Sequence, residues 1–86
     1  MKQIGFTGLG WEDYLSWQKD DRKILKKINK LIRDIQSHPF EGTGKPEQLQ
    51  YDLAGLWSRR IDREHRLVYQ VRGETIIIHS CRYHYN

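Results

Sequence analysis

The chain has 86 residues, which allow one small domain with a thin core, because a chain of this length buries only about 60–65% of its unfolded surface. Fifteen Lys and Arg against eleven Asp and Glu give a net charge of +4, and hydrophobic residues make up 37% of the sequence. The length excludes a two-domain enzyme, and no run approaches the roughly 20 apolar residues that a membrane span needs. We therefore expect one basic, soluble domain over residues 1–86 with an anionic partner and no membrane contact.

The single cysteine indicates the cellular compartment, and the uneven distribution of charge locates the basic segment. Cys81 has no second cysteine to pair with, and small secreted domains usually depend on disulfides, so we expect a cytoplasmic protein. Residues 1–5 lack the apolar core of a signal peptide. Residues 21–40 carry six basic and two acidic side chains, whereas the rest of the chain is balanced, so the basic excess belongs to one segment.

Two helices are predicted in the first half of the chain, after a short strand over residues 2–6. Residues 11–19 favour a short helix. A longer helix follows within residues 21–40, where Asp20 or Asp21 can cap the N-terminus and His38-Pro39 ends the pattern, because a residue before proline avoids helical angles. Its apolar side chains recur at helical spacing on one stripe: Ile24, Ile28, Leu31, Ile32 and Ile35.

The second half of the chain has the signals of a sheet. Residues 40–47 contain two glycines and a proline, which predict a loop. Strand-like runs then cover residues 56–61, 66–71 and 75–82, and the connections between them are short enough for hairpins. The order predicts an α+β fold in which two N-terminal helices pack on one face of a twisted antiparallel sheet. The other face is left to display arginines.

Metal and cofactor chemistry have little support in this sequence. The four histidines, His38, His65, His79 and His84, form no pair at i, i+4 spacing, and the lone cysteine has no partner at zinc spacing. No phosphate-binding glycine loop opens a helix, and no serine nucleophile motif is present. We expect no metal and no cofactor.

RNA cleavage through the 2′-hydroxyl matches the remaining candidates. That reaction needs a base for the 2′-hydroxyl proton, an acid for the departing 5′-oxygen and a cation for the charge on phosphorus. Glu47, His84 and Arg66 are residues of these types, and Tyr83 or Tyr85 can stack on an unpaired base. Each also has an ordinary interpretation, such as a solvated loop carboxylate, an exposed strand arginine or a polar tail, and sequence spacing does not show that they meet.

Gly-Lys-Pro-Glu, Trp-Ser-Arg-Arg-Ile, Glu-His-Arg-Leu-Val-Tyr and the closing Tyr-His-Tyr are specific as a set. With these stretches the chain resembles the Txe/YoeB branch of the RelE-like toxins, from bacterial type II toxin–antitoxin modules. The resemblance runs from about residue 11 to residue 85 without a clear gap, over residues 11–18, 26–32, 39–47, 56–61, 64–69 and 81–85.

The resemblance implies a RelE-like, microbial-RNase-like fold and a ribosome-dependent endonuclease that cuts mRNA in the ribosomal A site. By position, Glu47 is similar to the family's general base, His84 to its general acid, Arg66 to its phosphate-stabilising arginine and Tyr85 to its substrate-positioning tyrosine. The implied partners are a YefM-like antitoxin that blocks the site, the 70S ribosome with its rRNA and mRNA, and a second copy of the chain. The candidate RNA contacts beyond these are Arg59, Arg60, Lys23, Lys27, Lys30 and Tyr83.

Three departures from the family pattern and two alternatives remain. Residues 5–10 are unusually rich in glycine, residues 48–50 lack a basic side chain after Glu47, and Asn86 follows the tyrosine that usually ends such chains. The alternatives are a non-catalytic inhibitor of gyrase within the same superfamily, and an RNA-binding or ribosome-binding module without catalysis. The former is disfavoured because such proteins are not expected to carry Glu47, Arg66, His84 and Tyr85 together.

Overall fold

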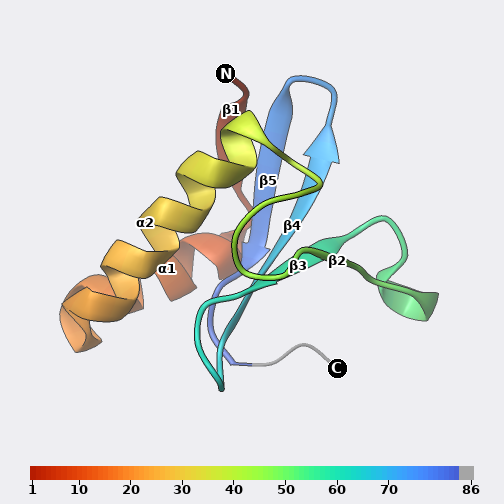
Figure 1. Cartoon of the computed structure of the whole chain (residues 1–86). Helices are drawn as coiled ribbons and strands as arrows, with labels where there is room; N and C mark the ends of the chain where they lie inside the picture. Colours follow the sequence, from red (N-terminus) through yellow and green to blue (C-terminus); the bar gives the residue numbers. More distant parts are fainter. Residues whose placement is uncertain (84–86) are drawn as a thin grey trace.

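Two helices and five strands make up residues 1–83, which are the residues that the computed structural model describes (Figure 1). The predicted α+β architecture is confirmed, with both helices packed on a mostly antiparallel sheet. In chain order the elements are β1 (Gln3–Phe6), α1 (Gly8–Asp20), α2 (Arg22–Ser37), β2 (Glu47–Gln48), the 3₁₀ turn η1 (Tyr51–Leu53), β3 (Trp57–Arg60), β4 (Arg66–Arg72) and β5 (Thr75–Ser80).

The sheet has the strand order β1-β5-β4-β3-β2. The two predicted hairpins are confirmed, since β3 pairs antiparallel with β4 and β4 with β5. Two features differ from the prediction. First, β1 runs parallel to β5, so the sheet is not wholly antiparallel. Second, the predicted loop over residues 40–47 ends in the short edge strand β2, which has only two residues and therefore no alternation to detect.

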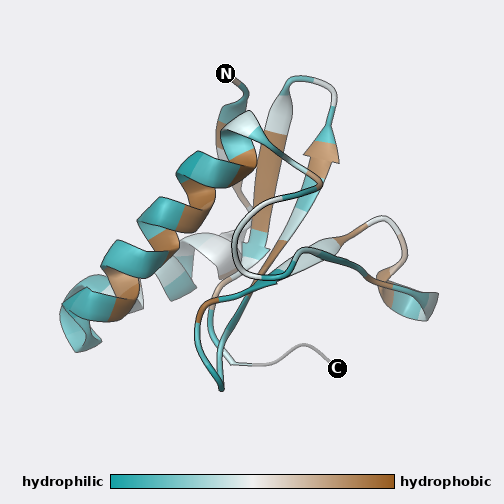
Figure 2. Cartoon of the chain, viewed as in Figure 1, coloured by the Kyte–Doolittle hydropathy of each residue, from teal (hydrophilic) through white to brown (hydrophobic). Residues whose placement is uncertain are grey.

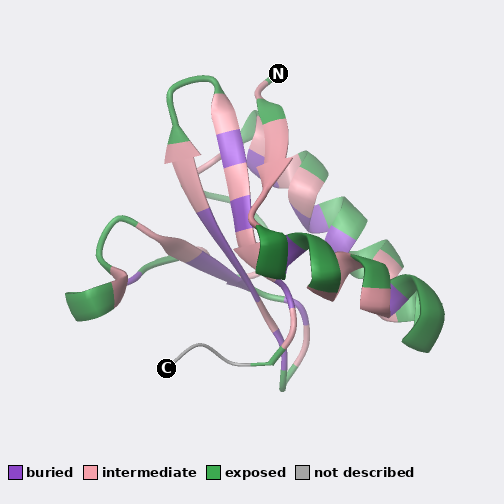
Figure 3. Cartoon of the chain, turned by 180° about the vertical axis from the view of Figure 1, so that it is seen from behind, coloured by how far each residue is buried: buried purple, intermediate pink, exposed green. Residues whose placement is uncertain are grey.

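The long helix α2 forms where its periodicity predicts it. The carboxylate of Asp21 accepts hydrogen bonds from the backbone N–H groups of Lys23 and Ile24, which caps the N-terminus, and the helix ends directly before His38. Its apolar side chains form a stripe on the side that faces the sheet (Figure 2). That stripe and Trp17 of α1 pack on β4 and β5, which contribute Leu67, Tyr69, Ile76 and Ile78. Figure 3 shows buried positions on both helices and on these strands.

The short helix α1 starts at Gly8, three residues before the predicted start. The side chain of Thr7 accepts a hydrogen bond from the backbone N–H of Gly10 at 3.0 Å and caps the helix there. Gly10 lies against β5 so closely that a Cβ atom would overlap the carbonyl oxygen of Ile78. Gly10, within the glycine-rich segment over residues 5–10, therefore permits a close approach between helix and sheet.

No helix among residues 1–83 is long and apolar enough to cross a membrane.

Candidate functional site

Glu47, Arg60 and Arg66 share the sheet face that the helices leave open. In antiparallel pairs, directly opposed residues project to the same face. Glu47 opposes Ser58, Ser58 opposes Val68, and in the next row Arg60 opposes Arg66. Arg59 of β3 and Leu67 of β4, which lie between these positions, are buried on the helix-covered face. Side chains therefore alternate between the two faces, as a sheet requires.

The register of the sheet sets the distance between Glu47 and Arg66. They lie two strands apart and two residues along, so their Cα atoms are about 12 Å apart by ideal strand spacings. Glu47 is exposed and is one of the residues, 47–53, that line a hollow of about 460 Å³. This face therefore carries a carboxylate and a guanidinium, with the buried residues Ser58 and Val68 between them.

The turn between β3 and β4 orients Arg66. Its Nη1 atom donates to the backbone carbonyls of Asp62 at 2.8 Å and His65 at 3.1 Å. Asp62 closes the same turn, because its carboxylate accepts from the backbone N–H groups of Glu64 at 2.8 Å and His65 at 2.7 Å. Burial opposes ionisation of Asp62, but those two N–H groups lower its pKa below the usual value, so the carboxylate stays ionised at neutral pH.

The end of the described chain is attached beside Arg66. The backbone N–H of Arg66 donates to the carbonyl of Tyr83 at 3.0 Å, and the backbone N–H of Tyr83 donates to Nδ1 of His65 at 2.7 Å. The predicted residues His84 and Tyr85 lie outside the described residues. Tyr83, which directly precedes them, is exposed, as a base-stacking residue would need to be.

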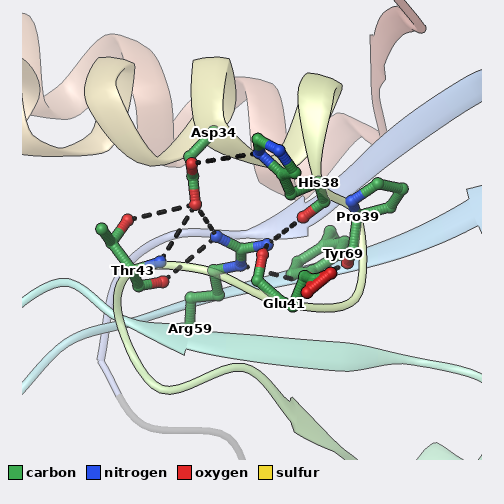
Figure 4. A network of polar contacts seen from close by, with 7 residues as sticks. All are labelled: Asp34, His38, Pro39, Glu41, Thr43, Arg59 and Tyr69. Carbon is green, nitrogen blue, oxygen red and sulfur yellow. Dashed lines mark hydrogen bonds and ion pairs between the residues drawn. The ribbon is translucent and has the colours of Figure 1, made fainter.

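Arg59 was predicted as an RNA contact, and the structure corrects this. Its side chain is fully buried on the helix side of β3, where an incoming RNA cannot reach it. The guanidinium forms an ion pair with Asp34 of α2, and its Nε donates to the hydroxyl of Tyr69 (Figure 4). A buried arginine is tolerated only when its donors are satisfied inside the protein, and these are.

The same guanidinium organises the loop that leads from α2 to Glu47. It donates to the backbone carbonyls of His38, Glu41 and Thr43, while the hydroxyl of Tyr69 donates to the carbonyl of Pro39 at 2.7 Å (Figure 4). Three consecutive parts of this loop are therefore attached to one side chain of β3. Arg59 positions the segment that delivers Glu47 to the edge of the sheet.

Asp34 completes this network from α2. The backbone N–H of Thr43, and next the Arg59 side chain, lower the pKa of its carboxyl. Gly42 makes the close approach possible, because it has a φ of +126° and a Cβ atom there would overlap the Asp34 carboxylate. Gly44, with a φ of +81°, lies similarly close to Leu31 and Arg59, so both glycines of the predicted loop have a packing role.

Basic side chains line a groove of about 660 Å³ between α2, the 43–45 loop and the β3–β4 turn. Its floor is apolar, formed by Leu31 and Ile61. Its two carboxylates, Asp34 and Asp62, already accept hydrogen bonds within the protein. The groove therefore presents net positive charge to an anionic partner, because its lining includes Lys27, Lys30, Lys45, Arg60 and Arg63.

Three of the predicted RNA contacts line this groove, and a fourth lies outside it. Lys27, Lys30 and Arg60 come together in it, whereas Lys23 is exposed on α2 outside it. Lys45 and Arg63 were missed by the sequence reasoning, although Lys45 belongs to the Gly-Lys-Pro-Glu stretch. Within residues 1–83, no group of three histidine, cysteine, aspartate or glutamate side chains is placed to hold a metal ion.

Comparisons with known proteins identify the family. The sequence model of the YoeB-like toxin of bacterial type II toxin–antitoxin systems matches residues 6–85. This chain belongs to the YoeB toxin family. Toxin YoeB of Escherichia coli K12 is 59% identical over 75 residues, which are 87% of this chain and 89% of that protein.

Two solved structures of YoeB toxins from Staphylococcus aureus match the fold closely. One is a heterotetrameric YoeB–YefM toxin–antitoxin complex, whose toxin is 48% identical, with a TM-score of 0.90 over 99% of both chains. The other is a YoeB dimer, also 48% identical, with a TM-score of 0.90 over 98% of both chains. The predicted family and its RelE-like fold are thereby confirmed.

Proposed function

We propose that this chain is a ribosome-dependent endoribonuclease that cuts mRNA in the ribosomal A site and thereby inhibits translation. The observation that carries the proposal is that Glu47 and Arg66 share the open face of the sheet, in a chain that belongs to the YoeB toxin family. A single sheet face then supplies both a proton acceptor and a cation for phosphate.

The reaction is an attack of the ribose 2′-oxygen on the adjacent phosphorus. The Glu47 carboxylate takes the 2′-hydroxyl proton, the new bond from the 2′-oxygen to phosphorus forms, and the bond from phosphorus to the 5′-oxygen breaks. Arg66 stabilises the negative charge on the phosphoryl oxygens, His84 donates the proton that the 5′-oxygen needs, and Tyr85 positions the substrate. The products are a 2′,3′-cyclic phosphate and a 5′-hydroxyl. Each proton-transfer group contributes typically ~10²–10⁴-fold to the rate.

The basic groove supports a role in docking to ribosomal RNA. It adjoins the open face through Arg60, so a nucleic acid backbone can follow cations from α2 to the site. Lys23 extends this charge along α2, and the exposed ring of Tyr83 is available to stack on a base.

The partners follow from the relatives. Because a Staphylococcus aureus relative is bound to the antitoxin YefM and another forms a dimer, we infer a YefM-like antitoxin and a homodimer for this chain. We place the protein in the cytoplasm, where its ribosome is, and treat residues 1–86 as one toxin domain.

The decisive experiment maps mRNA 5′ ends by primer extension, with and without translating ribosomes. The wild-type protein is expected to create new ends inside codons only when ribosomes translate the message. Glu47→Gln and His84→Gln should abolish these ends while circular dichroism shows an intact fold, and Glu74→Gln, at the exposed turn between β4 and β5, is the matched control.

Other outcomes reverse the assignment. Inhibition of gyrase supercoiling with intact mRNA would favour a gyrase inhibitor, and salt-dependent ribosome binding without new ends would favour a binding module.

A further inference from the structure

The last described segment, Cys81–Tyr83, leaves the sheet and is held by side chains. Both backbone polar groups of Cys81 are bonded to α1, since its N–H donates to the carboxylate of Asp13 at 3.0 Å and its carbonyl accepts from the indole N–H of Trp17 at 2.8 Å. Its own side chain is buried, and burial raises the pKa of the thiol to about 12, so it remains a neutral packing group. Cys81 is therefore fixed on α1 after the β5 ladder has ended.

Arg82 adds a second attachment to α1. Its Nη1 atom donates to the hydroxyl of Ser16 at 2.7 Å and to the carboxylate of Asp20 at 2.8 Å. The guanidinium also lies over the ring of Trp17, 4.2 Å from its centroid. Two successive residues are thus attached to the same helix.

Tyr83 is attached on the opposite side, by the β3–β4 turn. Its N–H donates to Nδ1 of His65 at 2.7 Å, and its carbonyl accepts from the backbone N–H of Arg66 at 3.0 Å. Its φ is +63°, in the left-handed region, which costs a residue other than glycine roughly 1–2 kcal/mol. These two hydrogen bonds hold the chain in a conformation that it would not choose by itself.

The His65 ring is itself held firmly. Its side chain is 9% exposed, and it packs edge-on against Trp17 with the ring centroids 4.7 Å apart. Because Nδ1 accepts the Tyr83 hydrogen bond, the ring proton is assigned to Nε2, which faces the Glu64 carboxylate at 3.6 Å. His65 therefore acts as a rigid hydrogen-bond acceptor between α1 and the chain end.

We propose that His65 is a positioning residue, whose Nδ1 fixes the point in the fold from which His84 and Tyr85 continue. The role rests on the proposed function, because His84 is the acid and Tyr85 the positioning group of that reaction. The same arrangement links the chain end to Arg66. His65 accepts from the N–H of Tyr83, and the next residue, Arg66, donates to the carbonyl of Tyr83. His65 therefore acts through the backbone of Tyr83 and not on the reacting atoms.

Loss of the acceptor is expected to affect the rate more than binding. A misplacement of about 1 Å in a reacting group can cost roughly 100-fold in rate, while the groove that binds the anionic partner stays intact. The signature is therefore a reduced kcat at an unchanged KM.

The test compares His65→Leu with His65→Asn, two side chains of nearly equal shape that differ in whether an acceptor replaces Nδ1. In ribosome-dependent mRNA cleavage, His65→Leu should lower kcat ~10–100-fold without changing KM, and His65→Asn should recover most of the loss. Hydrogen exchange of the Tyr83 amide should be slow in the wild type and in His65→Asn, and fast in His65→Leu.

A semisynthetic chain removes the donor instead and leaves every side chain in place. Cys81 permits ligation of residues 81–86 as a synthetic peptide, in which an ester replaces the amide between Arg82 and Tyr83. The ester chain should lose kcat as His65→Leu does, and the same ligation with an ordinary amide is the control. This version remains decisive if His65→Leu fails to fold.

Some results would overturn the role of His65. They are equal cleavage by the ester and amide chains, equal rates for the two His65 variants, or unchanged Tyr83 exchange in His65→Leu. If instead the wild type cuts no mRNA on ribosomes, the proposed function fails, and the exchange of the Tyr83 amide still reports whether His65 holds the chain end.

Discussion

Arg59 brings a positive charge into the core, where five acceptor groups surround it. Arg59 lies on the same face of β3 as Trp57, which is the face that packs against the helices. Its burial could not be predicted, because the carboxylate that neutralises it, Asp34, lies 25 residues earlier in the chain. The sequence pattern of a strand does not distinguish an exposed arginine from a buried one unless the position of that partner is known.

Asp34→Asn tests this network at the scale of one residue. Breaking this ion pair leaves the charge of the buried Arg59 uncompensated, so we expect the free energy of unfolding at pH 7 to fall by roughly 3 kcal/mol. The pKa of Asp34 is lowered in the folded state, so its contribution is present above about pH 4 and is lost as the pH falls through the folded value.

Urea unfolding at several pH values measures the effect. The gap between the wild type and Asp34→Asn should narrow below about pH 4, while Asp52→Asn, at an exposed carboxylate, should match the wild type throughout. A gap that does not change with pH would contradict the assigned role of the ionised carboxylate.

At the scale of single elements, those with several periodic side chains were easier to predict than short or glycine-rich ones. The spacing of Ile24, Ile28 and Leu31 specifies one buried stripe, and Asp21 marks the start of α2, so both bounds were close to those observed. The start of α1 was missed, because glycine is a poor helix former and the reason for Gly10 is a contact with a strand almost seventy residues later. β2 was missed because two residues carry no period.

Gly10→Ala tests the contact between α1 and β5. The added methyl would overlap the Ile78 carbonyl, so the helix must shift, and we expect a loss of about 1–3 kcal/mol in the free energy of unfolding. Gly8→Ala is the matched control, because a Cβ atom there meets nothing within 4 Å. Thermal unfolding by circular dichroism compares them, and equal melting temperatures for the two variants would argue against the close packing.

At the scale of the whole molecule, the excess basic charge and the proposed catalytic residues belong to different segments of the chain. The excess of basic residues was visible in the sequence, and the structure brings part of it, Lys27 and Lys30 of α2, into one groove with Arg60 of β3. The proposed site was predicted as a set of residue types. That Glu47 and Arg66 share a face depends on the register of three strands, which the sequence does not reveal.

Removal of groove cations should weaken docking to the ribosome. Each lost phosphate contact reduces the magnitude of the negative slope of log affinity against log salt by roughly 0.7–0.9. The double variant Lys27→Ala with Lys30→Ala should therefore reduce that magnitude by about 1.5. Lys26→Ala is the control, because Lys26 is exposed on the same helix and does not line the groove. Sedimentation with 70S ribosomes at increasing salt measures the slope, and equal slopes for both variants would exclude the groove as a phosphate contact.

The central claim, that this chain cuts mRNA through the 2′-hydroxyl, is tested most directly by removing that hydroxyl. Ribosomes are programmed with an mRNA in which one ribose, directly 5′ of the cut, is replaced by 2′-deoxyribose, and single-turnover cleavage is compared with the all-ribose message. We predict rapid cleavage of the ribose message to a 2′,3′-cyclic phosphate and a 5′-hydroxyl, and no cleavage at the deoxy position. Cleavage of the deoxy message at the same bond would contradict the account.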